Sequence, residues 1–286
     1  MHRVARLWLL VPALWVFSSG PTAAPPTEPQ AVPSVNLHRP LDQILDLNVR
    51  DGLVYYRALR AERGRLDRYI ASLNVAEKTY AGWERDHRIA FWINAYNAFV
   101  LQTVIDHYPI KGAITTVPAS SIRQIPGAFD QKRHRAAGRS LSLDEIEKSV
   151  LPEFKDPRVY LALGRGAVGS GRLRSEAFDG ARLQQQLDRI QSEFVSEQTM
   201  LKIDRAAEQV AVTAIVSWRG AEFIAAYDKG ATGPMAQRSP IERAIVAFIT
   251  PHLLPLEREL IQQNEFKVTF QPFDWRLNDL TGGRPQ

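Results

Sequence analysis

Residues 158–174 combine glycines, a serine and arginines in a pattern that can bind an anion, and they contain no acidic residue. The arginines are Arg158, Arg165, Arg172 and Arg174. A glycine turn exposes backbone N–H groups that can form an anion-binding nest, and guanidinium groups grip carboxylate or phosphate bidentately. We therefore expect an anionic small molecule, glycan or peptide to bind here through Arg165, Gly166, Ser170 and Arg172. The alternative is a solvated basic loop.

The stretch Gly164–Gly169 also fits the G-x-G-x-x-G pattern of dinucleotide sites. Such a site needs a helix that opens inside the motif, within a βαβ unit. Here Ser170-Gly171-Arg172 continues the turn, and the next helical pattern begins near Asp179. The pattern therefore favours a glycine turn, and we expect no nucleotide or other cofactor.

Two side chains are weak candidates for catalysis. Ser170 could act as a nucleophile, but Val168 and Arg172 stand where a nucleophile elbow needs small residues. Its alternative role is that of a turn serine that bonds to the local backbone. Glu147 could act as a catalytic acid, or it could be an exposed acid on a short helix.

Two asparagines lie inside the strongest predicted helix, at residues 84–107. This segment is apolar almost all round, which indicates a buried helix. Buried amides need hydrogen-bond partners, so we expect Asn94 and Asn97 to tie the helix to neighbouring loops. The alternative is that Asn97 lines a ligand cleft. We expect Asp274, beside Trp275, to accept backbone hydrogens at the end of the last strand.

The composition excludes several kinds of site. The chain of 286 residues has no cysteine, which excludes disulfides, thiolate metal sites and a cysteine nucleophile. Its six histidines include no pair at four-residue helical spacing, so we expect no transition-metal site. The net charge is +5. The first 24 residues contain Arg3 and Arg6 and no acid, so removing them leaves +3, too little basic bias to predict nucleic-acid binding.

The N-terminal 24 residues are typical of a secretory signal peptide. His2, Arg3 and Arg6 make a basic start, Leu7–Phe17 is apolar, and small residues follow up to Ala24. The apolar run is too short for a membrane span, and we expect no stable span in the mature chain. Residues 25–40 read as a flexible, proline-rich leader. We therefore expect an exported protein, periplasmic or secreted. The alternative is an uncleaved N-terminal anchor.

The elements that position these residues indicate a mostly helical α+β domain. Strands are expected at 53–56, 158–163, 210–216 and 266–273, and residues 120–139 read as an exposed loop or hairpin. Two capping boxes, at Ser142 and Ser239, each begin a helix. The remaining helices are expected at 41–47, 59–73 and 181–194. We predict one domain over 41–280, with a small and mainly antiparallel sheet, and a tail at 281–286.

Several short blocks resemble the DUF547 family, named for a domain of unknown function. The blocks follow one another in the order of the family. They are Asp51–Tyr56, Phe91–Ala98, Leu141–Glu147, Asp156–Tyr160, Trp218–Phe223 and Phe273–Asn278. The resemblance covers roughly residues 41–280 and implies an uncharacterised exported α+β protein.

This chain departs from the family pattern where chemistry is most expected. Family members usually carry Asn-Cys and then Cys-Pro, at positions occupied here by Gly164, Arg165, Ser170 and Gly171. A histidine that follows their Ile-Glu pair is Lys148 here. We therefore expect a binding or accessory protein of the cell envelope. The alternatives are a hydrolase or transferase of envelope peptide or glycan with a non-cysteine nucleophile, and a structural interaction module.

Overall fold

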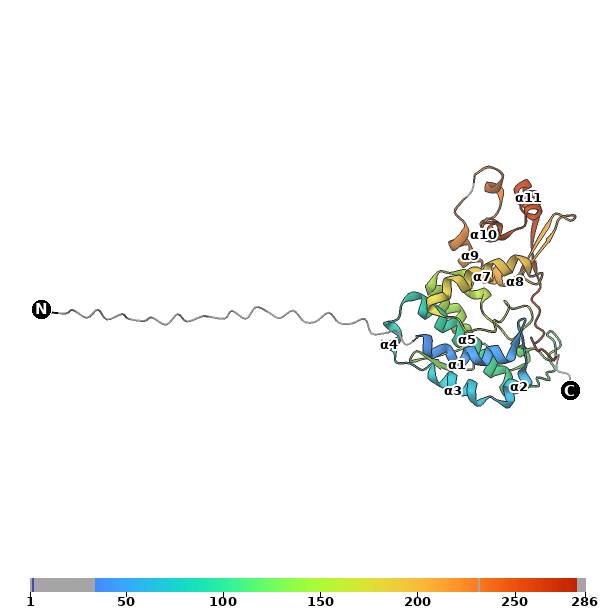
Figure 1. The fold of residues 1–286 in the computed structure, drawn as a ribbon. Coiled ribbons are helices and arrows are strands. Elements are labelled where there is room, and N and C mark those ends of the chain that lie inside the picture. Colours follow the sequence, from blue (N-terminus) through green and yellow to red (C-terminus); the bar gives the residue numbers. More distant parts are fainter. Residues whose placement is uncertain (1, 3–33, 231, 282–286) are drawn as a thin grey trace. The chain divides into compact units, whose positions relative to one another are not determined.

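The computed structural model describes residues 2, 34–230 and 232–281. Helix α5 (Arg85–His107) runs through the middle of the folded residues from Ser34 onward (Figure 1). Sixteen of its residues are buried, including every residue from Ile89 to Leu101. A helix that is apolar on all sides is stable only when other elements surround it. Helices α1, α2, α3 and α7 all pack against α5, so it forms the centre of the core.

The other helices differ from α5 in being short or only partly buried. The α-helices are α1 (Ser34–Asn48), α2 (Tyr56–Ala61), α3 (Gly64–Ser72), α4 (Glu77–Ala81), α6 (Leu143–Glu145), α7 (Leu183–Ser196), α8 (Ala214–Trp218), α9 (Gly220–Tyr227), α10 (Pro240–Ile249) and α11 (Pro255–Gln263). A π-helical turn, η2 (Ile146–Val150), continues α6. The 3-10 helices are η1 (Ile122–Gln124), η3 (Leu151–Phe154), η4 (Pro157–Leu161), η5 (Gly180–Arg182), η6 (Gly233–Gln237) and η7 (Thr250–His252).

The described strands form three small sheets. Two are hairpins, β1 (Val49–Arg50) with β2 (Leu53–Val54) and β3 (His134–Ala136) with β4 (Arg139–Leu141). In the third, β6 (Gln209–Thr213) pairs antiparallel with β5 (Leu201–Asp204) and parallel with β7 (Lys267–Gln271). One compact unit holds the described residues from Ser34 to Thr281. The prediction of a mostly helical α+β fold, in which the strands are few and mainly antiparallel, is confirmed.

The strand predicted at 158–163 is wrong. Residues Pro157–Leu161 form η4, which Asp156 caps by accepting a hydrogen bond from the Arg158 N–H at 3.1 Å. Pro157 at the first position fixes a helical φ. Every residue from Val159 to Leu163 is buried. The alternating apolar positions of the sequence therefore do not separate a buried face of a strand from an exposed one.

Three element boundaries also differ from the predictions. Helix α1 begins at Ser34 and contains Pro40, so the end of the expected flexible leader is helical. The helix predicted at 59–73 is divided into α2 and α3, and the strand predicted at 210–216 ends at Thr213, where α8 begins. Most of the predicted signal peptide and leader, residues 3–33, lies outside the described residues. In the described part of the chain, every helix is too short or too polar to cross a membrane.

The chain after β7 runs back across the molecule toward α2 (Figure 1). The Val54 N–H donates to the Asn278 carbonyl at 2.8 Å, and the Leu280 N–H donates to the Val54 carbonyl at 2.9 Å. The Tyr56 hydroxyl donates to Asn278 Oδ1 at 2.7 Å. These bonds fix a C-terminal segment, residues 272–280, which carries Trp275 over the surface.

Two buried histidines, His38 and His134, should make the protein less stable in acid. Burial lowers the pKa of His134 to about 4, an effect that the Lys132 charge adds to and Asp106 opposes. Burial likewise lowers the pKa of His38 to about 4, with Asp179 opposing it. The unfolded chain binds these protons near pH 6.5, so the free energy of unfolding should fall as the pH drops from 6.5 to 4. The expected loss is about 3 kcal/mol per histidine.

Urea unfolding between pH 7.5 and pH 4 tests this expectation with two variants. His134→Phe keeps a ring against Phe99, whose centroid lies 4.4 Å from the imidazole, and should remove about half of the pH dependence that the two histidines cause. Phe99→Leu is the control, because it weakens the packing at every pH without removing the imidazole. If the free energy of unfolding of His134→Phe falls with pH as steeply as that of the wild-type protein, the prediction is wrong.

Candidate binding cleft

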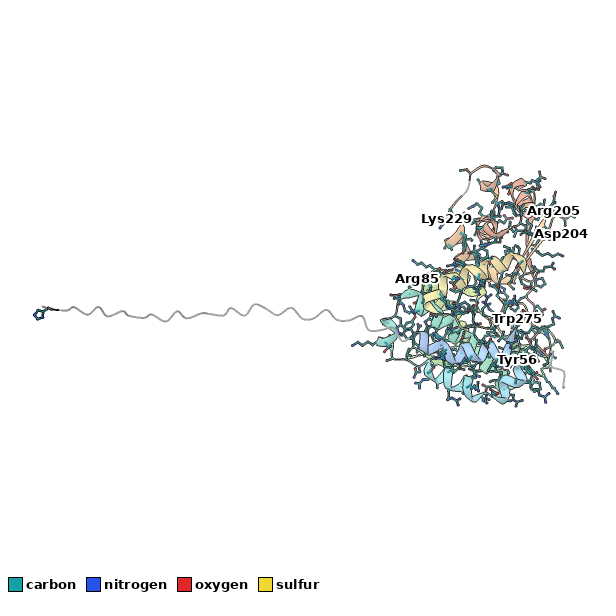
Figure 2. The ribbon with its side chains drawn as sticks, viewed as in Figure 1. Tyr56, Arg85, Asp204, Arg205, Lys229 and Trp275 are labelled. Carbon is teal, nitrogen blue, oxygen red and sulfur yellow. The ribbon has the colours of Figure 1, made fainter. Side chains whose placement is uncertain are left out.

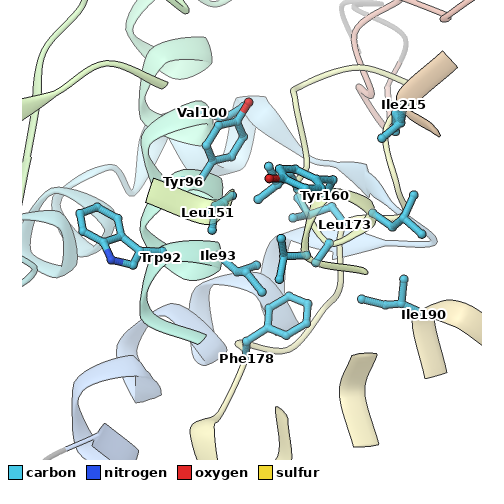
Figure 3. Close-up of a cluster of buried hydrophobic side chains, with 14 of the residues drawn as sticks. Trp92, Ile93, Tyr96, Val100, Leu151, Tyr160, Leu173, Phe178, Ile190 and Ile215 are labelled. Atoms are coloured by element: carbon cyan, nitrogen blue, oxygen red, sulfur yellow. The ribbon is translucent and has the colours of Figure 1, made fainter. Parts of the chain in front are cut away.

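The two asparagines of α5 fasten the neighbouring loops to the core. Asn97 Nδ2 donates to the Ala162 carbonyl at 3.1 Å, and its Oδ1 accepts from the Gly164 N–H at 2.8 Å. Asn94 bonds the backbone of Phe178 in the same two-sided way, at 2.8 and 2.9 Å. Figure 3 shows Phe178 and Tyr160 close to the α5 side chains Ile93 and Tyr96. The predicted tethering role of both asparagines is confirmed.

The glycine loop 164–171 is expected from the sequence to offer its N–H groups to an anion, but several of these groups have partners within the protein. The Arg165 N–H donates to Ser170 Oγ at 2.9 Å, and the Val168 and Gly169 N–H groups donate to carbonyls of the C-terminal segment. Gly166, at φ +66°, brings the backbone against α5, where a Cβ would lie 3.3 Å from Val100. The loop is therefore packed between α5 and the C-terminal segment.

The Arg165 side chain is buried and does not point into solvent as the basic-loop interpretation requires. Only 2% of its surface is exposed. Its Nη2 and Nε donate to the two carboxylate oxygens of Glu147 at 2.7 and 3.2 Å, and its Nη1 donates to the carbonyls of Tyr160 and Leu163. The guanidinium thus joins the glycine loop to the π-helical turn η2.

The other predicted ligand contacts make no hydrogen bond with the Arg165 guanidinium in the described part of the chain, although Ser170 accepts the Arg165 backbone N–H. Arg172 forms an exposed ion pair with Asp51. Ser170 is buried, and a smaller cavity of about 130 Å³ that it lines with Arg172 and Asn278 has no histidine in its wall. Asp274 accepts from the Arg276 N–H at 3.0 Å, as expected of a strand-end residue. Asn97, Glu147 and Asp274 do not line the cavity of Ser170.

A cleft of about 450 Å³ lies on the other side of Glu147, and we call it the aromatic cleft. Its volume is in the range of small-molecule sites. The charged residues that line it are Arg123, Asp130, Asp144, Glu147, Lys148, Arg165 and Arg219. The aromatic residues are Phe129, Trp218 and Trp275, and Ile125, Gly127 and Ala128 complete the wall. Elements far apart in the chain thus supply one site.

The buried ion pair of Glu147 and Arg165 forms part of the wall of the aromatic cleft. Burial raises the pKa of the Glu147 carboxyl, but the Arg165 guanidinium, with the Arg219 charge and the Tyr96 hydroxyl, outweighs that effect and the pKa lies below its usual value. Glu147 is therefore ionised at neutral pH, and its oxygens also accept the Tyr96 hydroxyl at 3.3 Å. An ionised carboxylate in this position can accept a hydrogen bond from a ligand, but it has no proton to give as a general acid.

Two further arginines of the cleft retain unused donors. Arg219 Nη2 donates to the Tyr160 hydroxyl at 2.7 Å and pairs with Glu222, whereas its Nη1 has no hydrogen-bond partner in the described part of the chain. The Arg123 guanidinium lies 4.7 Å from the centroid of the Trp275 ring and has no acidic partner among the described residues. Arg123 and Arg219 can therefore still receive an anion.

Sequence reasoning missed Arg123, Trp218, Arg219 and Trp275. No local spacing relates these residues, because they come from η1, from the end of α8 and from the C-terminal segment. Trp218, Arg219 and Trp275 stand in two of the short blocks named in the sequence analysis, Trp218–Phe223 and Phe273–Asn278. No group of three or more His, Asp or Glu side chains could hold a metal ion in the part of the chain that the structure describes.

Residues 80–195 match the family described as "Protein of unknown function, DUF547". The matched segment includes α5, the glycine loop and the cleft residues Arg123, Glu147 and Arg165, whereas Trp218 and Trp275 lie beyond it. Comparisons with curated proteins and with solved structures give no match.

Proposed function

We propose that this DUF547-like protein is exported and binds a small anionic ligand in the aromatic cleft. The observation that carries the proposal is the unpaired Arg123 guanidinium at the exposed edge of the cleft. An exposed arginine stacked on a tryptophan keeps all five N–H donors available in a fixed planar arrangement. Arg219, with its spare Nη1, offers a second donor group on the same cleft.

The remaining charges of the cleft support a ligand with a single negative charge. Lys148 pairs with Asp144 at 2.5 Å, Arg165 pairs with Glu147, and Arg219 pairs with Glu222. A polyphosphate would meet these carboxylates and be repelled by them, since like charges at short range are unfavourable. A monocarboxylate can bind to Arg123 and Arg219 while the lining acids accept hydrogen bonds from neutral donors of the ligand.

Isothermal titration calorimetry with small carboxylates tests the proposed anion site. Arg123→Gln should weaken binding about ten- to a hundred-fold, because a charge-assisted hydrogen bond is removed. Arg205→Gln is the matched control: it removes the same charge from the turn between β5 and β6, which Figure 2 shows well away from Trp275. The proposal is wrong if both variants weaken binding equally or if no carboxylate in the series binds.

Export is the second part of the proposal and rests on the basic start and the apolar run Leu7–Phe17. The full-length protein, produced in a Gram-negative host, should appear in the periplasm or the medium with a new N-terminus near Pro25. N-terminal sequencing of the fractionated protein identifies the cleavage site. Retention of an uncleaved chain in the cytoplasm contradicts the proposal.

The hydrolase and transferase interpretation receives less support from the geometry. Ser170 Oγ accepts the Arg165 N–H, and its cavity offers no histidine to act as a base. The carboxylates of Asp51 and Glu197 line the cavity, but neither is hydrogen-bonded to Ser170 in the described part of the chain. A serine nucleophile needs a base within hydrogen-bond reach. Ser170→Ala should therefore leave ligand binding in the aromatic cleft unchanged within about two-fold, measured in the same titration.

A further inference from the structure

We infer that the ligand of the aromatic cleft is a pyranose ring carrying one carboxylate, as in an acidic glycan, and that the ring stacks on Trp218, the exposed member of an aromatic wall that Trp218 forms with Trp275. The inference rests on the proposed anion site, and it adds the chemical class of the ligand. It depends on the arrangement of the aromatic rings and on the polar groups around them.

The aromatic wall is exposed at Trp218, whereas Trp275 is half-buried and has the Arg123 guanidinium over its ring. Trp218 keeps 46% of its surface exposed, although most large aromatic side chains of this protein are buried. The Trp218 and Trp275 rings are nearly parallel, at an interplanar angle of 21° and a centroid distance of 6.2 Å. Phe273 packs behind both, at 4.9 Å from Trp218 and 4.4 Å from Trp275.

Backbone bonds fix the position of Trp275. The segment that carries it is bonded to the glycine loop on both sides, because Val168 and Gly169 donate to the carbonyls of Arg276 and Asp274 at 2.8 and 2.9 Å. Phe129 also contacts the Trp275 ring edge-on, at 6.0 Å. A rigid aromatic surface loses little conformational entropy when a ligand binds, so the wall is suited to recognition.

The chemistry around the wall favours a sugar over other flat ligands. The face of a pyranose is made of C–H groups, whose weak positive charge complements the negative face of an indole ring. Its hydroxyl groups both donate and accept hydrogen bonds. Asp130, which has no ion pair among the described residues, can accept from a hydroxyl, and Arg123 can bind a carboxylate. An apolar ligand would leave both charges desolvated and unpaired.

A nucleotide would also stack on tryptophan, but its phosphates carry more negative charge than this cleft accommodates. Asp130, Asp144 and Glu147 all line the cleft. A sugar with one carboxylate places its charge at Arg123 and presents only neutral groups to these acids. The cleft therefore fits a monoanionic polyhydroxylated ring.

The test uses the purified mature protein and a matched set of probes. The ring acids are glucuronate, galacturonate and N-acetylmuramate. Gluconate has the same carboxylate and hydroxyl chemistry in an open chain, and the methyl ester of galacturonate has the ring without the charge. We expect at least one ring acid to bind at least ten-fold more tightly than gluconate and than the methyl ester, and to change the tryptophan fluorescence.

Variants of the wall separate stacking from charge. Trp218→Ala should weaken binding of the ring acid at least ten-fold and leave gluconate binding unchanged, whereas Trp218→Phe should retain most of the affinity. Phe270→Ala is the control, because Phe270 is 41% exposed but lies on β7 outside the cleft. Thermal unfolding of each variant shows whether it is folded.

The outcomes distinguish this inference from the proposed function. If gluconate binds as tightly as every ring acid and Trp218→Ala binds them normally, the sugar assignment is overturned and the anion site stands. If the methyl ester binds as tightly as galacturonate and Arg123→Gln has no effect, the anion site itself is overturned. Binding of the ring acids that depends on both Arg123 and Trp218 supports both.

Discussion

Replacing Arg165 with methionine is expected to lower the free energy of unfolding by about 3–5 kcal/mol, the usual cost of breaking a buried ion pair by removing one partner. The variant leaves the Glu147 carboxylate, which is 13% exposed, without the guanidinium that bonds both of its oxygens. It also leaves the carbonyls of Tyr160 and Leu163 without a donor. Urea unfolding at pH 7, followed by circular dichroism, measures the loss.

A double-mutant cycle with Glu147→Leu tests whether the loss comes from the ion pair. Removing both charges leaves no unpaired ion, so the double variant should recover most of the stability that either single variant loses. Losses that simply add would show that the two side chains are not coupled.

The pH dependence of Arg165→Met gives an independent check. In the wild-type protein the pKa of Glu147 lies below its usual value. The ion pair with Arg165 therefore stabilises the folded protein at pH values above the pKa of Glu147 in the unfolded chain, and this stabilisation is lost as the pH falls. Without Arg165, burial raises that pKa, and protonation at low pH relieves the unpaired charge. The difference in stability between the two proteins should therefore shrink between pH 7 and pH 4.

Gly171→Ala is expected to destabilise the protein by about 3 kcal/mol or more, or to prevent folding, because the added methyl group has no space. A Cβ at this position would overlap the carbonyl oxygen of Leu161, a backbone atom that cannot rotate away. Gly171 does not need a left-handed φ, so the cost is steric. Thermal and urea unfolding measure it, or the yield of soluble protein where the variant does not fold.

Gly64→Ala is the matched control for the glycine variant. Gly64 lies in α3, and the nearest atom to its Cβ is the flexible end of Arg68, at 3.5 Å. Alanine is a better helix former than glycine, so this variant should be unchanged or stabilised by up to about 1 kcal/mol. A Gly171→Ala protein as stable as Gly64→Ala would show that the loop 164–171 is not packed as described.

The glycine loop shows what a local sequence pattern leaves open about its backbone N–H groups. A run of glycines and arginines has the same sequence pattern whether its backbone N–H groups face solvent, where they can bind an anion, or bond to a neighbouring segment. Here the C-terminal segment, about a hundred residues later, accepts two of those N–H groups. The pairing that consumes them could not be seen from local spacing, because it joins distant parts of the chain.

The sequence by itself determined the central helix, the tethering role of Asn94 and Asn97, both serine capping boxes and the mostly helical α+β class. Each of these depends on interactions within a few residues, or on burial that a helix apolar on almost all sides makes unavoidable. Only the tertiary structure decided that Arg165 is buried against Glu147 and that Trp218 and Trp275 form a wall beside Arg123. The reason is physical: backbone bonds and core packing between distant segments set the positions of those side chains, and no local periodicity records them.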